Sequence, residues 1–426
     1  MISYLSLAVV FACLSGFTYG YDICVISAVL KDIGRDMVVV DNMMDWMNEL
    51  IVAAMSLGML FSRMIGWKAA DILGRIKSLV IADIFITVSV LLTIWSEDFF
   101  LFLACRLILG FGIGLALLVG PTYLSEIAPK QYRGRLITLH ELCVCIGSVA
   151  GMASRFVLPS ASWRLLVGLS AVPSIVQLIL TVLLPESPRW LAMRGREVEA
   201  LAASTKLGID DSSKFTQASP QGLRSLLKKH WKSLAISSTI CNAGSACGFY
   251  AIQAFAVWAV PTFLPKLTET EVSRFILPAF GVSKLVGVVV CLLLIDLMGR
   301  RAVLLASLLV LCISHGMVLI SWQFADAGWF CVVGMGGAIF GWSLGLGSMT
   351  LLVSNEMLPT EYRALASSIC LSLNSVTELI YHLTFPTMFA VSPTLPFALF
   401  FAYCAFAAVV TFRHVPETIG KSLDHH

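Results

Sequence analysis

The chain has 426 residues, of which 58% are hydrophobic and only 13% are charged, and its mean hydropathy is +0.87. Soluble globular proteins carry about 25% charged residues, so this composition excludes a soluble globule and predicts an all-α membrane protein with many spans. The net charge of +3 is too small to suggest nucleic acid as a partner.

Apolar runs long enough to cross the hydrocarbon core, which takes about 20 residues, occur in two groups of six. The first group is 3–28, 48–66, 77–95, 99–120, 136–157 and 164–184. The second group is 234–262, 274–295, 302–322, 327–352, 366–388 and 394–413. The first run lacks the basic start and cleavage site of a signal peptide, so we expect it to be a span.

The two groups predict two six-helix halves, 1–184 and 234–413, separated by a linker with short helices at 185–233 and followed by a tail at 414–426. The linker is rich in lysine and arginine, whereas the first opposite loop, "KDIGRDMVVVDNMMD", is net acidic. By the positive-inside rule the linker and both termini face the cytoplasm. We expect a monomer in the lipid bilayer of the plasma membrane rather than of an organelle.

Matching phrases recur at equivalent points of the two halves. "GWKAADILGRIK" corresponds to "IDLMGRRAVLL", and "LSEIAPKQYRGR" corresponds to "SNEMLPTEYRAL". Such a repeat predicts an internally duplicated transporter. Its acids and arginines could form an ion network that closes the cytoplasmic side in one state and opens in another, or could only anchor the helices at the membrane surface.

We expect the cytoplasmic gate to consist of the charged residues of these phrases and of "PESPRWL": Asp71, Arg75, Glu126, Arg133, Glu186, Arg189, Asp296, Arg300, Glu356 and Arg363.

Several motifs together resemble the sugar porter family of the major facilitator superfamily. They are "GYD" (Gly20 to Asp22), "RLILGFGIG", "YLSEIAPKQYRG", "PESPRWL" (Pro185 to Leu191), "DLMGRR" and "PETIGKSL" (Pro416 to Leu423). The resemblance covers nearly the whole chain. Within the family, the chain looks most similar to proton-coupled polyol and hexose members. It implies a transporter that exposes a central site alternately to the two sides of the membrane.

The resemblance also implies a coupling pair. Proton symporters of this family are similar in having an aspartate in the first span near an arginine of the fourth, here Asp22 and Arg106. An acid at the membrane midplane costs roughly 2.5 to 3.5 kcal/mol to insert, so it is seldom retained without use. Asp22 is therefore expected to carry protons, with Arg106 modulating it; the alternative is a static pair that packs the first half.

The sugar-binding positions of the resembled family are largely replaced. Glu141 stands where the family tends to have a sugar-binding glutamine, and Lys284 and Glu378 stand where it tends to have asparagines. The glutamine pair of the seventh span is absent, although Gln253 lies one turn later. We expect the cavity to be lined by five residues: Glu141, Gln253, Lys284, Asn374 and Glu378.

Three readings of this set remain open. In the first, Glu141, Glu378 and Lys284 bind a hydroxyl-rich solute, and Lys284 pairs with one of the acids. In the second, the two acids select an organic cation or zwitterion. In the third, the charges are a fixed network in a relative that no longer transports. His382 is expected to be a core histidine rather than a proton relay. No P-loop, hydrolytic constellation or metal site is present in the sequence, so we expect no enzyme activity, cofactor or metal, and energy from gradients.

Overall fold

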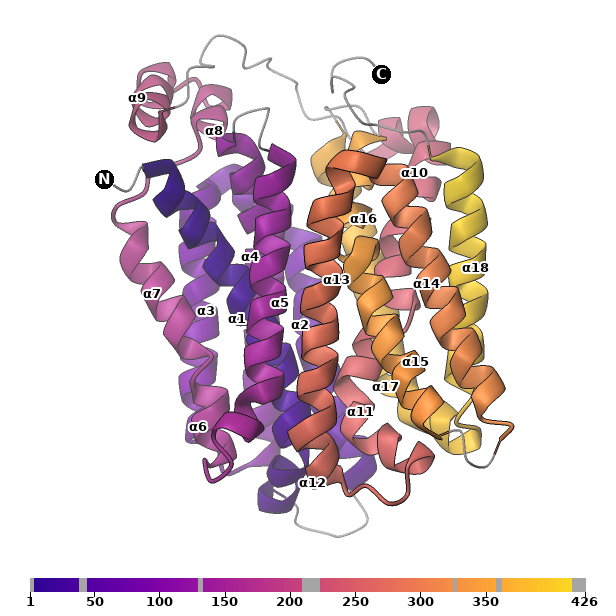
Figure 1. The fold of residues 1–426 in the computed structure, drawn as a ribbon. Helices are drawn as coiled ribbons and strands as arrows, with labels where there is room; N and C mark the ends of the chain where they lie inside the picture. The colour runs from indigo at the N-terminus through magenta and orange to yellow at the C-terminus, as the bar shows by residue number, and fades with distance from the viewer. Residues whose placement is uncertain are drawn as a thin grey trace.

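The computed structural model describes residues 4–37, 44–128, 133–208, 223–324, 328–357 and 362–415. Every regular element within these ranges is helical. The helices stand roughly parallel in two bundles that lie side by side, one built from the first part of the chain and one from the second (Figure 1). The all-α architecture predicted from composition is therefore confirmed.

The first bundle contains one helix for each predicted span except the last, which is broken at Leu169 and Ser170 into two helices. Its elements are α1 (Tyr4–Met37), α2 (Met44–Leu73), α3 (Arg75–Ile94), α4 (Phe99–Ile127), α5 (Arg133–Val157), α6 (Trp163–Gly168) and α7 (Ala171–Thr181).

The second bundle repeats this plan with more interruptions. Its elements are α10 (Leu223–Ala246), α11 (Phe249–Phe263), α12 (Glu269–Glu271), η2 (Val272–Ile276), α13 (Leu277–Met298), α14 (Arg300–Ser321), α15 (Gly328–Gly341), η3 (Trp342–Leu346), α16 (Gly347–Glu356), α17 (Arg363–Val391) and α18 (Leu395–His414).

The interruptions have local causes. Gly248 separates α10 from α11 with a φ of +80°, a conformation that residues with a Cβ rarely adopt, and a Cβ there would also collide with the ring of Phe400. η2 and η3 are single π-helical turns, which often mark functional positions inside transmembrane helices. η2 lies between α12 and α13, and η3 lies between α15 and α16.

Ten helical stretches in the described part of the chain are long and apolar enough to cross a membrane. They correspond to ten of the twelve predicted spans. The other two predicted spans, 136–157 and 366–388, lie in α5 and α17, which are long helices but carry more polar residues. The reason is their position, because α5 packs against α13 and α17 packs against α2, so both contact the opposite half.

Two short helices follow the first bundle, α8 (Pro188–Met193) and α9 (Glu197–Leu207). Ser187 caps α8 by accepting a bond from the backbone N–H of Trp190, and Pro188 occupies the first turn. Both helices lie at the end of the molecule where α1 begins and α18 finishes (Figure 1). α10 joins two helices at a kink at His230, so the part from Leu223 to the kink lies in the predicted linker and the part after it corresponds to the predicted span at 234–262.

Close contact between α1 and α5 depends on glycines. A Cβ added to Gly20 would overlap the backbone carbonyl of Val144, and one added to Gly147 would overlap that of Phe17. Small residues of this kind let membrane helices approach until their backbones touch. The contact fixes the two helices that carry Asp22 and Glu141.

We expect Gly20→Ala to destabilise the folded protein by about 1 to 3 kcal/mol, because overpacking forces the backbones apart. The thermal unfolding midpoint in detergent measures this loss. Gly316→Ala on α14 is the control, since its added Cβ would meet Phe401 at an ordinary 3.7 Å. Equal midpoints for the two variants would contradict the proposed role of the close contact.

Candidate functional site

A buried ion pair joins α1 to α4 near the middle of the first bundle. Asp22 Oδ2 lies 2.7 Å from Arg106 Nη1, and the two side chains are 0% and 2% exposed. Arg106 Nη2 also faces Met55 Sδ at 3.2 Å. Within the described residues, Asp22 Oδ1 and Arg106 Nε have no hydrogen-bond partner. The structure thus brings the two expected coupling residues together and leaves bonding capacity on both.

A small cavity lies beside this pair, between the two halves. Its polar lining comes from Ser56 and Arg106 in the first half and from Glu378 and His382 of α17 in the second, with Ser27 at its edge. The free volume is about 10 Å³, which is room for about one water molecule. The structure is therefore closed around this point.

Ser56 links two residues of α17, Glu378 and His382. Its Oγ lies 3.1 Å from Glu378 Oε1 and 2.9 Å from His382 Nδ1. His382, which was expected to be a core histidine, is buried and also lines the cavity. The available signal was its spacing, because residues four apart on a helix share one face.

Arg63 of α2 is a second residue that the sequence analysis did not select. It is 5% exposed, and it donates a hydrogen bond to Ser375 Oγ on α17. Ser375 lies one turn from Glu378, and the charges of Arg63 and Glu378 interact. The signal was a basic residue well inside an apolar run, which in a membrane helix suggests function.

Lys284 of α13 faces the first half. Its Nζ donates to Ser148 Oγ of α5 at 2.8 Å and lies 4.9 Å and 5.3 Å from the ring centroids of Phe249 and Trp342. The two rings are stacked, 3.8 Å apart with 6° between their planes. One of the three readings paired Lys284 with an acid; the structure instead gives the ammonium group a hydroxyl and two aromatic faces, which attract cations.

The other residues expected to line the cavity differ in their hydrogen-bond partners. Glu141 has an oxygen, Oε1, that is buried without a partner among the described residues, and its charge interacts with that of Lys284. Gln253 donates to Cys24 Sγ at 2.9 Å, across the two halves. Asn374 instead bonds the carbonyl of Cys241 on α10, so its amide is used inside the second half.

The charges follow a pattern across the two interfaces between the halves. At the α2–α17 contact, Arg63 comes from the first half and Glu378 from the second. At the α5–α13 contact, Glu141 comes from the first half and Lys284 from the second. The equivalent second and eighth spans thus carry the bases, and the equivalent fifth and eleventh spans carry the acids. Each interface holds one charge of each sign.

The halves also touch on both sides of the cavity. Toward the end that carries α12, Ser273 Oγ donates to the carbonyl of Ala28 at 3.3 Å. Toward the end that carries α8, Ser368 Oγ donates to the carbonyl of Arg63 at 2.8 Å. The structure is therefore an occluded one, closed toward both ends at these points.

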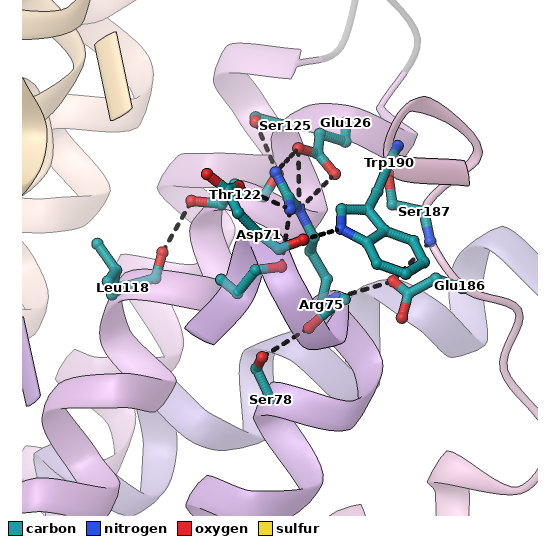
Figure 2. A network of polar contacts seen from close by, with 12 residues as sticks. Asp71, Arg75, Ser78, Leu118, Thr122, Ser125, Glu126, Glu186, Ser187 and Trp190 are labelled. Carbon is teal, nitrogen blue, oxygen red and sulfur yellow. Dashed lines mark hydrogen bonds and ion pairs between the residues drawn. The ribbon is translucent and has the colours of Figure 1, made fainter. Parts of the chain in front are cut away.

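An ion network lies at the α8 end of the first half (Figure 2). Arg75 binds Glu126 through Nε at 3.1 Å and Nη2 at 2.8 Å, and its Nη1 binds Asp71 at 3.2 Å. The Arg75 side chain is 7% exposed. The network connects the end of α2, the start of α3 and the end of α4. Because these three helices all belong to the first half, the network stabilises that half.

Glu186 closes the same network from the segment before α8. Its carboxylate accepts from the backbone N–H groups of Arg75 at 2.9 Å and of Ile76 at 3.2 Å, and Trp190 Nε1 donates to the carbonyl of Asp71 at 2.8 Å (Figure 2). The "PES" motif therefore caps the start of α3.

Not every expected gate residue joins this network. Arg189 makes no hydrogen bond or ion pair with the described residues. Arg300 is half-buried at the start of α14. Four expected gate side chains lie outside the described part of the structure: Arg133, Asp296, Glu356 and Arg363.

Burial raises the pKa of the Glu186 carboxyl above its usual value, although three backbone N–H groups oppose the shift. The folded chain therefore binds this proton more tightly than the unfolded chain, and we expect stability to rise as pH falls from neutral through the folded pKa. Glu186→Gln should remove this gain. Unfolding midpoints in neutral and mildly acidic buffer measure it.

Glu199 on α9 is the matched control for Glu186. A side-chain bond from Arg196 lowers its pKa, so its contribution is present above the unfolded pKa and is lost as pH falls. Glu199→Gln should therefore change the pH dependence in the opposite sense. The same sense in both variants would show that Glu186 does not act through its buried carboxyl.

Comparison with known proteins adds to this geometry. The family model "Sugar (and other) transporter" matches residues 8–426. Myo-inositol transporter 1 of Candida albicans is 28% identical over 96% of this chain and 80% of its own length. Probable polyol transporter 6 of Arabidopsis thaliana is 28% identical over 95% of this chain and 90% of its own length.

Solved structures share the fold. The proton:xylose symporter XylE bound to 6-bromo-6-deoxy-D-glucose gives a TM-score of 0.84 at 21% identity, covering 99% of this chain and 98% of that one. A partially occluded inward open conformation of XylE from E. coli gives 0.81 at 21% identity, covering 98% and 99%. At this identity the likeness demonstrates the two-bundle architecture.

Proposed function

Because the chain belongs to the family of sugar (and other) transporters, we propose that it carries a sugar or polyol across a membrane together with protons. The observation that carries the proposal is the buried pair of Asp22 and Arg106, 2.7 Å apart, beside a cavity between two six-helix halves. Transport follows when the halves rock and expose this region to either side in turn. We propose no enzymatic reaction.

Proton binding to Asp22 is the proposed coupling step. When Asp22 takes a proton, its charge is lost and Arg106 is released from its counter-ion, because the two share one close contact. A buried arginine without a partner is costly, so Arg106 then favours a different arrangement of the groups around it. Proton binding and the movement of the halves are linked in this way.

The balance of charge supports a neutral solute. The central region holds three acids and three bases: Asp22, Glu141, Glu378, Arg63, Arg106 and Lys284. An organic cation would need an excess of acid, which this set does not provide. Carboxylate, guanidinium and ammonium groups all bond hydroxyls well, and hydroxyl-rich solutes offer many of them. Inositol and polyol transporters among the relatives agree with this choice.

Glu141, Gln253, Lys284 and Glu378 are proposed to contact the solute once the cavity opens. Three of them hold polar atoms that are buried and unused by the described residues: Glu141 Oε1, Gln253 Oε1 and Glu378 Oε2. Buried polar atoms without partners are destabilising, so they favour binding of a group that satisfies them. Asn374 joins the set only if its bond to Cys241 opens.

The network around Arg75 is proposed as the first-half part of a cytoplasmic gate. This assignment places the α8 end on the cytoplasmic side, in agreement with the lysines and arginines of the linker. Both termini then face the cytoplasm. A monomer in the plasma membrane completes the proposal.

The test is uptake into proteoliposomes of labelled D-glucose, myo-inositol, choline and an amino acid, with and without an inward proton gradient, for wild type and Glu141→Gln. We expect gradient-dependent uptake of glucose or myo-inositol that survives in the variant. Uptake of choline or the amino acid alone, abolished in Glu141→Gln, would overturn the proposed substrate class.

A further inference from the structure

The hydrogen bonds at Ser56 determine where protons sit in the cavity wall. A serine hydroxyl has one proton to donate. If it goes to the Glu378 carboxylate, then His382 Nδ1 must carry a proton and donate it to the serine oxygen, since the two atoms are 2.9 Å apart. The proton of a neutral imidazole is then on Nδ1, and Nε2 is a bare acceptor.

Two acceptor atoms are consequently left without partners. Glu378 Oε2 and His382 Nε2 are buried and bond no group among the described residues. The side chains that carry them are fully enclosed, each residue being 1% exposed, and both line the cavity. A group that supplies a proton to these atoms would satisfy them, and a water molecule fits the cavity volume.

We propose that Glu378 is a second proton-binding site, held in position by Ser56 and His382. It lies on the second half, opposite the pair of Asp22 and Arg106 on the first, and Arg106 lines the same cavity. The proton binds Glu378 Oε2 from water in the cavity and returns to water when the cavity opens to the other side. The inference rests on the proposed function in that it gives the transporter a second coupled proton.

The groups that face Glu378 are compatible with this role. Arg63 on α2 and Arg106 on α4 are cations, and Asp22 on α1 is held by Arg106. The phenols of Tyr19 on α1 and Tyr250 on α11 also interact with its charge. The ionised carboxylate is thus balanced by Arg63, whereas the protonated form needs no counter-ion.

Protonation of Glu378 has a mechanical consequence. Arg63 loses its counter-charge and, among the described residues, keeps the hydroxyl of Ser375 and the sulfur of Met59, which lies 3.9 Å away. A buried guanidinium with so few partners is less stable, so the α2–α17 contact weakens. Because α2 and α17 belong to opposite halves, a proton on Glu378 promotes their separation.

The first test needs no substrate. Infrared difference spectra of the purified full chain, taken between acidic and alkaline buffer, detect the carbonyl stretch of each carboxyl group that gains a proton. We expect Glu378→Gln to remove one such band and Asp22→Asn to remove another. His382→Gln should move the pH at which the Glu378 band titrates, whereas His315→Gln, a buried histidine of α14 bonded to Cys247, should not.

The second test counts protons. In proteoliposomes loaded with a pH-sensitive dye and supplied with labelled myo-inositol or D-glucose, we expect the proton-to-solute ratio of wild type to fall by about half in Glu378→Gln, as removal of one of two equivalent sites requires. An unchanged thermal unfolding midpoint in detergent shows that the variant is folded. Ser56→Ala, which keeps the acid, retains the full ratio.

The outcomes separate the inference from the proposed function. If Glu378→Gln loses no pH-dependent carboxyl band, or loses one while the proton-to-solute ratio stays unchanged, the second proton site is overturned. If wild type transports without any proton movement, the proposed coupling fails, and a band lost in Glu378→Gln still locates a proton at this residue. A fall in the ratio together with loss of the band supports the inference.

Discussion

Asp22→Asn should lower the accumulation of solute against its gradient about tenfold for each pH unit of the proton gradient, while leaving exchange intact. A gradient of one pH unit supplies about 1.4 kcal/mol per proton, so each coupled proton supports about a tenfold accumulation. Asparagine keeps the shape of the side chain and still forms hydrogen bonds, but its amide does not take up a proton at the pH of the transport assay. The accumulation that depends on Asp22 should therefore disappear. Steady-state uptake of labelled solute, with and without the gradient, measures it.

Asp83 provides a matched control for this prediction. It is a buried acid of the same half, 0% exposed on α3, and both of its oxygens lack partners among the described residues. It does not line the central cavity. Asp83→Asn should keep the wild-type accumulation ratio. If Asp22→Asn accumulated solute as well as Asp83→Asn does, Asp22 would be a packing residue.

Loss of folding must be distinguished from loss of coupling. Asp22→Asn leaves the buried charge of Arg106 without its counter-ion, and breaking a buried pair costs about 3 to 5 kcal/mol. The double variant Asp22→Asn with Arg106→Gln removes both charges and should recover most of this stability. Restored unfolding midpoints without restored accumulation would assign the effect of Asp22 to proton coupling.

Much of the architecture could be predicted from the sequence because a membrane restricts the possible structures. Apolar runs separated by charged turns mark the helices, and the repeated "GR" phrases place Asp71 and Arg75 at the end of α2 and the start of α3. The structure places Asp22 in contact with Arg106, because two opposite charges in apolar helices need one another, and their role in proton coupling stays a prediction.

The arrangement of side chains between the halves was harder to predict. Helices such as α4 are apolar on every side, so their periodicity does not indicate which face meets the other half. Arg63 and His382 lie instead on α2 and α17, where a basic residue inside an apolar run and a spacing of four residues were available signals. One of the three readings paired Lys284 with an acid, but an ammonium group has three donors and can be satisfied by Ser148 and two rings instead. Only the packed structure selects between such partners.

The breaks inside the membrane spans were equally hard to predict from the sequence. The sequence suggests one continuous run at 327–352, whereas the structure has α15, the π-helical turn η3 and α16. The turn at η3 contains Trp342, whose ring stacks on Phe249 and whose Nε1 donates to the carbonyl of Gly244 at 2.8 Å. A change of one residue in helical register depends on these tertiary contacts, which hydropathy does not contain.

Arg75→Gln should destabilise the first half by about 3 to 5 kcal/mol, because it leaves the carboxylate of Glu126 without its buried partner. The guanidinium group makes contacts that a glutamine cannot replace, two short bonds to Glu126 and one each to Asp71 and the carbonyl of Ala70. Thermal unfolding in detergent measures the loss. Arg75→Lys should recover little of it, since a lysine lacks the planar fork that reaches several acceptors at once.

Arg196→Gln is the control for Arg75→Gln. Arg196 also pairs with a glutamate near the α8 end, but its side chain is 49% exposed and that of Glu199 is 55% exposed. Exposed pairs contribute only about 0 to 1 kcal/mol, so the unfolding midpoint should hardly change. If both arginine variants behaved alike, the network around Arg75 would be a set of surface anchors. A large loss confined to Arg75→Gln would instead mean that this network holds α2, α3 and α4 together, and that the first half moves as one unit when the transporter opens.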